Sequence, residues 1–236
     1  MEAICIFGDS LSRGVVFDRI RERYAFLKDS FVNLFCRKMR IRVINYAKFG
    51  CTIGKGNRLM DQHQAEIAGF DFTVLEFGGN DCDFDWARVA EAPEAEHLPK
   101  TPLDVFAATY AKLIDKTRAA GGNPVLLNLP PIHPKRYFSW VSRGLNGDNI
   151  LKWLGGSEEY IYRWHELYNM QVCQLAGEKQ VPLIDIRSVF LAQKDYGAYL
   201  CVDGIHPNEA GHQLISQAIE AAVARLMPRE AHDSRF

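Results

Sequence analysis

A serine near the start of the chain, and an aspartate and a histidine near its end, are the residues whose types can act together in catalysis. Ser10 stands in the segment Gly8-Asp9-Ser10-Leu11, whereas Asp203 and His206 share the segment Asp203-Gly204-Ile205-His206-Pro207. A serine hydroxyl is a weak nucleophile until a neutral imidazole accepts its proton, and a carboxylate on the other ring nitrogen orients that imidazole. The three residue types that this chemistry needs are therefore all present.

Five short apolar segments predict the strands that must position these residues. Each is followed by turn residues or a polar segment, and they cover Glu2–Phe7, Ile41–Tyr46, Phe72–Phe77, Pro124–Leu129 and Val181–Ile184. Between them lie segments with apolar residues three or four apart, which predict helices. The alternation predicts one three-layer α/β/α domain over residues 1–236, with a doubly wound, flavodoxin-like parallel sheet of about five strands.

Three of the predicted strands end in residues suited to a binding site. The first ends at Gly8–Ser12, the second runs into Asn45–Gly50, and the third into Gly78–Asp81. In open parallel sheets, ligands bind beyond the carboxyl ends of the strands. We therefore expect these three segments to meet at one edge of the sheet. The Asp203–His206 segment lies just before the last predicted helix, which begins near Pro207.

Four short blocks, in this order, resemble the GDSL/SGNH hydrolase family. They are Gly8–Leu11, Gly50, Gly78–Asp81 and Asp203–His206, and the continuation Pro207–His212 also looks like that of the family. Each block alone is weak, because short Gly/Asp/Ser strings end many strands. Four in order are specific. The second block departs from the pattern: family members often read Asn-x-Gly-x-Ser-Gly, where this chain has Asn-Tyr-Ala-Lys-Phe-Gly.

The resemblance implies hydrolysis of a carboxylic ester through an acyl-enzyme, with no cofactor and no metal. It implies Ser10 as nucleophile, His206 as general base and Asp203 as its orienting carboxylate. It also implies an oxyanion hole made by the backbone N–H groups of Ser10 and Gly50 and the side-chain amide of Asn80. Such donors are needed because attack on an ester carbonyl places a negative charge on oxygen.

The composition favours a small-molecule substrate. The formal net charge is −1 and no run of lysine or arginine stands out, which argues against nucleic-acid binding. The first residues lack a basic segment followed by an apolar stretch, and no apolar run approaches the roughly 20 residues needed to span a bilayer. The six cysteines are scattered singly, which fits a reducing setting. We expect a cytoplasmic protein; the sequence sets no oligomeric state.

Two segments are longer than a compact α/β unit needs. They are Cys82–Thr101 and the segment from Pro130 to about Glu158; long loops of this kind are usually functional. The second combines aromatic residues with arginine, lysine and four glycines, so we predict that residues 130–158 form a lid over the strand ends. Its composition favours small-acyl, sugar-linked esters. Beyond Pro228 the polar tail is expected to be frayed.

Three other interpretations of the function remain possible at this point. Long-chain acyl esters or thioesters could be cleaved by the same three residues. A non-catalytic carbohydrate- or lipid-binding module is a second reading, although such a module is expected to lose residues that this chain keeps. The third is a metal-assisted phosphoesterase using Asp81, Asp83 and Asp85, whose segment lacks the glycine and distal glutamate of an EF-hand loop.

Overall fold

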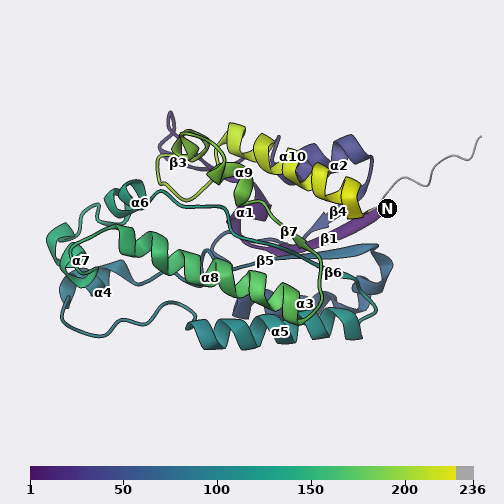
Figure 1. The fold of residues 1–236 in the computed structure, drawn as a ribbon, viewed down its shortest axis with the longest axis horizontal. Coiled ribbons are helices and arrows are strands. Elements are labelled where there is room, and N and C mark those ends of the chain that lie inside the picture. The colour runs from purple at the N-terminus through teal and green to yellow at the C-terminus, as the bar shows by residue number, and fades with distance from the viewer. Residues whose placement is uncertain (227–236) are drawn as a thin grey trace, which may run out of the picture.

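A five-stranded parallel sheet forms the centre of the computed structural model, which describes residues 1–226 (Figure 1). In the order β4-β1-β5-β6-β7, its strands are β4 (Arg42–Asn45), β1 (Ala3–Gly8), β5 (Phe72–Glu76), β6 (Pro124–Leu127) and β7 (Leu183–Ile184). The second strand of the sheet in sequence lies outside the first and the others follow on the opposite side, which is the predicted flavodoxin-like order. The expected frayed tail after Pro228 lies outside the described residues.

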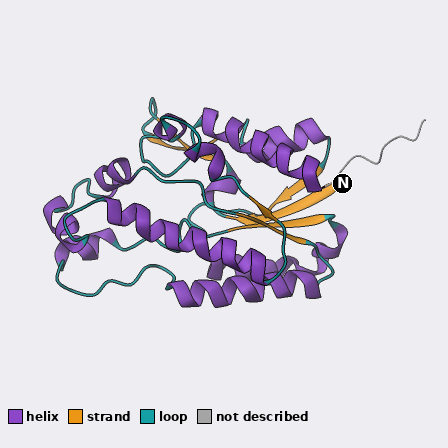
Figure 2. Cartoon of the chain, viewed as in Figure 1, coloured by secondary structure: helices purple, strands orange, loops and turns teal. Residues whose placement is uncertain are grey.

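Helices cover both faces of this sheet, which confirms the expected three layers (Figure 2). One face carries α2 (Phe31–Met39) and α10 (Glu209–Leu226), and the other carries α3 (Ile53–His63), α5 (Leu103–Ala119) and α8 (Glu159–Glu178). Strand β1 is buried along its whole length. Because successive strand side chains point to opposite faces, Cys5 and Phe7 join the core under α5 and α8, while Ile4 and Ile6 join the core under α2 and α10.

A two-stranded antiparallel hairpin, absent from the sequence prediction, follows the first strand. It consists of β2 (Val15–Asp18) and β3 (Arg23–Phe26), and it does not join the main sheet. The short helix α1 (Ser10–Arg13) leads directly into it, and Gly14 caps that helix with φ +77°. A Cβ at this position would stand 2.5 Å from Cβ of Ser30. The entry to the hairpin therefore requires glycine.

The two long segments of the sequence contain short helices that build a third hydrophobic cluster. They are α4 (Trp86–Glu91), α6 (Pro134–Val141) and α7 (Gly147–Trp153), and they gather with the start of α8 beyond one end of the sheet (Figure 1). Buried members of the cluster include Phe84, Trp86, Ile150, Leu154 and Ile161. The segment from residue 130 to 158 is thus mostly helical, and it packs a core of its own.

The remaining short elements connect these parts. They are the 3₁₀ segments η1 (Gln64–Gly69) and η2 (Tyr196–Tyr199) and the helix α9 (Ser188–Leu191). Within residues 1–226, no helix combines the length and the apolar character needed to cross a membrane.

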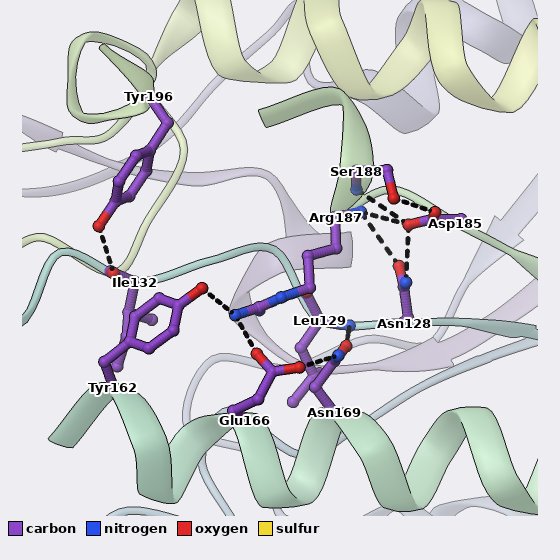
Figure 3. A network of polar contacts seen from close by, with 10 residues as sticks. All are labelled: Asn128, Leu129, Ile132, Tyr162, Glu166, Asn169, Asp185, Arg187, Ser188 and Tyr196. Carbon is purple, nitrogen blue, oxygen red and sulfur yellow. Dashed lines mark hydrogen bonds and ion pairs between the residues drawn. The ribbon is translucent and has the colours of Figure 1, made fainter. Parts of the chain in front are cut away.

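A buried arginine ties the ends of β6 and β7 to α8 (Figure 3). Arg187 is 4% exposed, donates hydrogen bonds to the hydroxyl of Tyr162 (2.7 Å) and to the carbonyl of Leu129 (3.2 Å), and pairs with the carboxylate of Glu166. A buried guanidinium is tolerated when several acceptors replace its water shell. The contacts of Arg187 therefore fix the chain just beyond β6 against α8.

Two asparagines complete this Arg187 network, which we define as Asn128, Tyr162, Glu166, Asn169, Asp185 and Arg187. Oδ1 of Asn128 accepts from the backbone of Ile186 at 2.7 Å, and its amide donates to Asp185 at 2.8 Å. Asn169 accepts from the backbone of Leu129 and donates to Glu166 (Figure 3). The carboxyl ends of β6 and β7 are thus joined by side chains, where the two-residue β7 provides few backbone bonds.

Candidate active site

The serine, histidine and aspartate selected from the sequence lie in one hydrogen-bonded chain. Nε2 of His206 is 2.9 Å from Oγ of Ser10, and Nδ1 is 2.7 Å from Oδ2 of Asp203. A carboxylate only accepts, so the ring carries its proton on Nδ1 and accepts from the serine hydroxyl at Nε2. All three side chains are buried to at least nine-tenths. This arrangement lets the imidazole take the hydroxyl proton during attack on a carbonyl.

Ser10 owes its position to the turn between β1 and α1. Asp9 is the N-cap of α1, and its Oδ1 accepts from the backbone N–H of Leu11 at 2.8 Å. A Cβ at Gly8 would lie 2.8 Å from the carboxylate of Glu76, so the strand can pass that close only with glycine. The serine consequently starts a helix directly at the carboxyl end of a central strand.

The segment 203–206 is a tight turn held by the aspartate itself. Oδ1 of Asp203 accepts from the backbone N–H groups of Ile205 and His206, both at 3.1 Å. Burial alone would raise the pKa of Asp203, but the hydrogen bonds from the His206 ring and from these N–H groups outweigh it and hold the pKa below its ordinary value. Asp203 is therefore anionic at neutral pH, as an orienting carboxylate must be.

Gly204 brings this turn against the start of α6. Its φ is +77°, and a Cβ would lie 2.8 Å from both Cβ of Arg136 and the carbonyl oxygen of His133. The backbone N–H of His133 donates to the Gly204 carbonyl at 2.7 Å. The turn that carries His206 is thus bonded to the long segment that the sequence predicted to be a lid.

The three groups predicted as oxyanion donors lie around Ser10 and line the same cavity. The side-chain amide of Asn80 donates one hydrogen to Oδ2 of Asp9 at 2.8 Å, which leaves the other free. Gly50 adopts φ +67°, a conformation that favours glycine. The backbone N–H groups of Ser10 and Gly50 make no hydrogen bond to any group of residues 1–226. These donors are available to a ligand.

A second buried acid, which sequence reasoning did not select, supports the serine turn. Oε2 of Glu76, at the end of β5, accepts from the backbone N–H of Asp9 (3.2 Å) and from the hydroxyl of Ser12 (2.9 Å). Burial, and then the neighbouring Asp9 carboxylate, raise the pKa of Glu76 well above its ordinary value. The sequence does mark this residue, because Glu76 is the one glutamate within the apolar predicted strand Phe72–Phe77. An acid in such a strand is rarely buried without a partner.

A cavity of about 460 Å³ opens from Ser10 toward the third hydrophobic cluster. Its inner wall is apolar and aromatic, and is formed by Phe84, Trp86, Ile132, Tyr137, Val141, Leu154, Tyr160, Ile161 and Trp164. These residues come from α4, α6, α8 and the loops around them. The two long segments of the sequence, together with α8, therefore form one largely apolar pocket beside the serine, whose lining also includes Asp83, Lys100 and His165.

Aromatic rings from other elements surround the imidazole at the opposite side. The ring centroid of Tyr24, on β3, lies 5.2 Å from that of His206, and the ring of Phe49 lies nearly parallel to the imidazole at 6.2 Å. Trp140 of α6 is 6.1 Å from Tyr24. Burial, and then the charge of Asp203, raise the pKa of Tyr24, so its hydroxyl stays protonated. Neither Tyr24 nor Phe49 was selected from the sequence.

The three aspartates considered as metal ligands each have other partners. Asp81 accepts from the backbone of Ile53 and from Thr101 Oγ1, Asp83 accepts from Trp86, Tyr137 and Lys100, and Asp85 caps α4. Within the described residues, no group of three or more His, Cys, Asp or Glu side chains is arranged to hold a metal ion. The three carboxylates serve the loop and α4 instead.

The sequence matches the model of the GDSL-like lipase/acylhydrolase family over residues 6–214. It is also 22% identical over 223 residues to the spore germination lipase LipC of Bacillus licheniformis, an alignment that covers 91% of this chain and 93% of that protein. The matched range includes the serine turn, both glycine blocks and the segment 203–206.

Solved structures share the fold. A lipase/acylhydrolase from Enterococcus faecalis is similar with a TM-score of 0.68 at 19% identity, over 98% of this chain and all of that one. An acetylxylan esterase from Geobacillus stearothermophilus, solved as a catalytic mutant, is similar with a TM-score of 0.63 at 20% identity, over 94% of each chain. With the family match covering most of its length, this chain belongs to the GDSL-like lipase/acylhydrolase family and is a carboxylic-ester hydrolase.

Proposed function

We propose that the protein cleaves carboxylic esters through an acyl-enzyme formed on Ser10. The observation that carries the proposal is the chain from Ser10 through His206 to Asp203, which opens on a cavity lined by unused hydrogen-bond donors. Family membership supports it, because the four blocks that define the resemblance hold these residues.

In the first half-reaction, Oγ of Ser10 attacks the ester carbonyl and its proton passes to Nε2 of His206. Asp203 accepts from Nδ1 and stabilises the imidazolium that forms. The carbonyl oxygen becomes an anion, which accepts from the N–H groups of Ser10 and Gly50 and from Asn80. The imidazolium then protonates the alcohol oxygen as the carbonyl–oxygen bond breaks. Water repeats the steps on the acyl-enzyme and releases the acid.

Asp9 has a supporting part in this proposal, as a positioning residue. Its Oδ2 accepts from one hydrogen of the Asn80 amide, so the remaining hydrogen is directed by a fixed partner. Its Oδ1 meanwhile holds the start of α1. One carboxylate thus links the serine turn to the oxyanion donor that follows β5, and the spacing between nucleophile and donor does not depend on either loop alone.

For the acyl group, we propose apolar chains longer than acetyl. The sequence predicts a small acyl group, whereas a cavity of about 460 Å³ falls within the roughly 300–1,000 Å³ typical of pockets for drug-sized ligands. Each methylene buried there contributes about 0.8 kcal/mol. Among similar proteins, one is named a lipase and another an acetylxylan esterase, so relatives support both sizes, and the apolar wall supports the longer chain.

The segment 130–158 is, in this proposal, the wall of the acyl pocket and the lid over it. Tyr137, Val141 and Leu154 from this segment line the cavity. Tyr137 donates to Asp83 at 2.5 Å, which binds α6 to the loop before α4. Replacing residues 139–155 by a short glycine-serine linker is expected to flatten the dependence on acyl length, with labelling of Ser10 retained within about tenfold.

A series of p-nitrophenyl esters from acetyl to palmitoyl tests the substrate proposal. We expect kcat/KM to rise from acetyl to butanoyl and hexanoyl, and Leu154→Trp, which fills the pocket, to move the optimum back toward acetyl. Leu191→Trp is the matched control, because Leu191 is exposed and lies outside the cavity. A wild-type optimum at acetyl would restore the small-acyl prediction. Failure of every ester, with Ser10 unlabelled by a fluorophosphonate, would refute ester hydrolysis itself.

A further inference from the structure

The alcohol half of an ester substrate has to lie beside His206. In the proposed reaction, the alcohol oxygen receives its proton from Nε2 of this ring, and proton transfer needs the two atoms within hydrogen-bond reach, roughly 2.6–3.2 Å. Whatever group that oxygen carries is therefore placed against the immediate surroundings of the imidazole. The carbonyl carbon of the ester carries three groups: the alcohol oxygen beside His206, the carbonyl oxygen facing the donors near Asn80, and the acyl chain. The acyl chain therefore extends in a direction different from that of the alcohol.

Two aromatic side chains lie beside the imidazole and a third lies beside one of them; we call the three the aromatic rim: Tyr24, Phe49 and Trp140. Tyr24 and Phe49 lie against His206, with ring centroids 5.2 and 6.2 Å from it, and they are 5.2 Å from one another. All three line the cavity that contains Ser10. Phe49 is 53% exposed, so much of its surface is open to a ligand.

The rim is built from three separate parts of the chain, which hold its rings in place. Tyr24 stands opposite Phe17 in the hairpin register, and Phe17 in turn packs edge-on against Trp140 at 4.8 Å. The guanidinium of Arg143 lies over the ring of Trp140, 3.9 Å from its centroid. Phe49 comes from the loop after β4 and directly precedes Gly50. The hairpin, α6 and the oxyanion loop thus converge on one rim.

The rim and the inner pocket differ in a way that suits the two halves of an ester. The inner pocket is closed by buried residues such as Leu154 and Ile161, whereas the rim contains half-exposed rings. The alcohol leaves before the acyl group in the proposed mechanism, so it belongs on the open side. Aromatic rings such as those of Tyr24 and Phe49 favour a flat, apolar partner, which packs on them by stacking or edge-to-face contact.

From these observations, we propose that the aromatic rim is the leaving-group subsite and that it takes arylmethyl alcohols, with benzyl alcohol as the simplest member. This inference rests on the proposed ester hydrolysis, since it names the alcohol that the same site releases. It also assigns a use to Phe49, whose ring is 53% exposed beside His206.

Esters with one acyl group and different alcohols test the subsite. We expect kcat/KM for benzyl butanoate to exceed that for methyl butanoate by roughly tenfold, after division by the rate of each ester in alkaline solution. Cyclohexylmethyl butanoate has similar bulk and no flat face, and we expect it to react several-fold more slowly than the benzyl ester. All three form the same butanoyl-enzyme, so the acyl pocket contributes equally to each.

Two variants from different elements identify the rings responsible. Phe49→Leu and Trp140→Leu are each expected to lower the preference for benzyl over methyl ester by about five- to tenfold. Phe26→Leu is the matched control: this ring belongs to the same hairpin and is 66% exposed, but lies outside the cavity, so the preference should not change. Circular dichroism and labelling of Ser10 establish that each variant is folded.

Transfer to an added alcohol supplies a test that is independent of leaving-group chemistry. Benzyl alcohol bound at the rim attacks the butanoyl-enzyme: its oxygen bonds to the carbonyl carbon, its proton passes to His206 and then to Oγ of Ser10, and benzyl butanoate leaves. We expect benzyl alcohol to capture the acyl group at least about fivefold more efficiently than methanol at equal concentration, and Trp140→Leu to remove that advantage.

The outcomes separate this inference from the function on which it rests. Hydrolysis of methyl butanoate with no preference for the benzyl ester would overturn the subsite and leave the hydrolase proposal standing. A preference for cyclohexylmethyl over benzyl ester would overturn the assignment to flat alcohols. If no ester is cleaved and Ser10 is not labelled, the proposed function fails first.

Discussion

Two buried polar networks lie at the carboxyl edge of the same sheet, and they differ in how many of their hydrogen-bonding groups have a partner within the protein. In the Arg187 network the guanidinium, Asn128 and Asn169 all bond to other groups of the chain. Around Ser10, the N–H groups of Ser10 and Gly50 and one hydrogen of Asn80 are left unused. Paired polar groups stabilise the fold, whereas unused ones lower the energy of a bound species that carries charge.

This difference predicts that substitutions in the two networks separate activity from stability. Groups reserved for the substrate can be removed with little loss of folding free energy. Groups that satisfy each other cannot, because removing one leaves its partner buried and unpaired.

Ser10→Ala is expected to produce the largest effect. We predict a fall in kcat of at least about 10³-fold, since the nucleophile is lost, while the free energy of unfolding changes by less than about 1 kcal/mol. Steady-state kinetics and urea unfolding measure the two quantities. A folded variant with near-wild-type turnover, or a fluorophosphonate adduct mapped to another serine, would show that Ser10 is not the nucleophile.

Asn80→Ala should follow, with a fall in kcat of about 10²–10³-fold, because it removes a donor directed at the developing oxyanion. The labelled residue should remain Ser10. KM has to be measured as well as kcat. An intact kcat with a raised KM would mean that Asn80 binds the ground state of the substrate and does not act on the transition state.

Arg187→Met tests the other network. We expect the free energy of unfolding to fall by roughly 3 kcal/mol, because Glu166 and the Leu129 carbonyl lose their buried partner, while kcat of the folded enzyme changes by less than about fivefold. Lys38→Met is the matched control: it breaks an exposed ion pair with Glu220 and should cost less than about 1 kcal/mol. A hundredfold loss of activity without loss of stability would place Arg187 in the active site.

An effect of similar size, confined to acid pH, concerns a buried histidine. Burial, and then the charge of Arg187, lower the pKa of His165 to about 3. Between that value and its ordinary pKa near 6.5, the unfolded chain binds a proton that the folded chain does not, so the stability it contributes is lost as the pH falls. His165→Phe removes this group. Its stability relative to wild type should therefore rise by up to ~3 kcal/mol between pH 7 and pH 4.

His212 provides the comparison for that measurement. Burial lowers its pKa to about 4. The pH range over which His212 destabilises the fold therefore begins at the same upper pH as for His165, but it is narrower. His212→Phe should show the same direction with a smaller gain. Parallel stability curves for wild type and both variants would disprove the proton linkage of these histidines.

The regular layers were predictable from sequence because their signal is local. All five strands of the main sheet fall inside or overlap the predicted segments, since each is an apolar run followed by turn residues. Ser10, Asp203 and His206 were selected because their short blocks occur in a recognisable order along the chain. Both results depend on residues that are neighbours in the chain, or on a motif read in order.

The hairpin and the aromatic rim could not be predicted for a related reason. Residues 15–26 have only three apolar residues at each end, with a mostly charged stretch between them. The turn has Glu22 with φ +50° where an Asn-Gly or Asp-Gly pair is the usual signal. Tyr24 and His206 meet only through packing between distant segments. The same holds for Glu76. The sequence places this acid in a predicted strand, but it does not indicate that Asp9 and Ser12 are its hydrogen-bond partners.

A backbone hydrogen bond joins the two ends of the hairpin. The backbone N–H of Leu27 donates to the carbonyl of Gly14 at 2.8 Å, so the chain enters and leaves residues 15–26 through one joint. The turn that carries Ser10 lies before that joint and α2 begins after it. Hairpins of other lengths grafted between Gly14 and Leu27 are therefore expected to change the surroundings of His206, while the hydrogen bonds of Asp9 and Glu76 still hold the turn that carries Ser10.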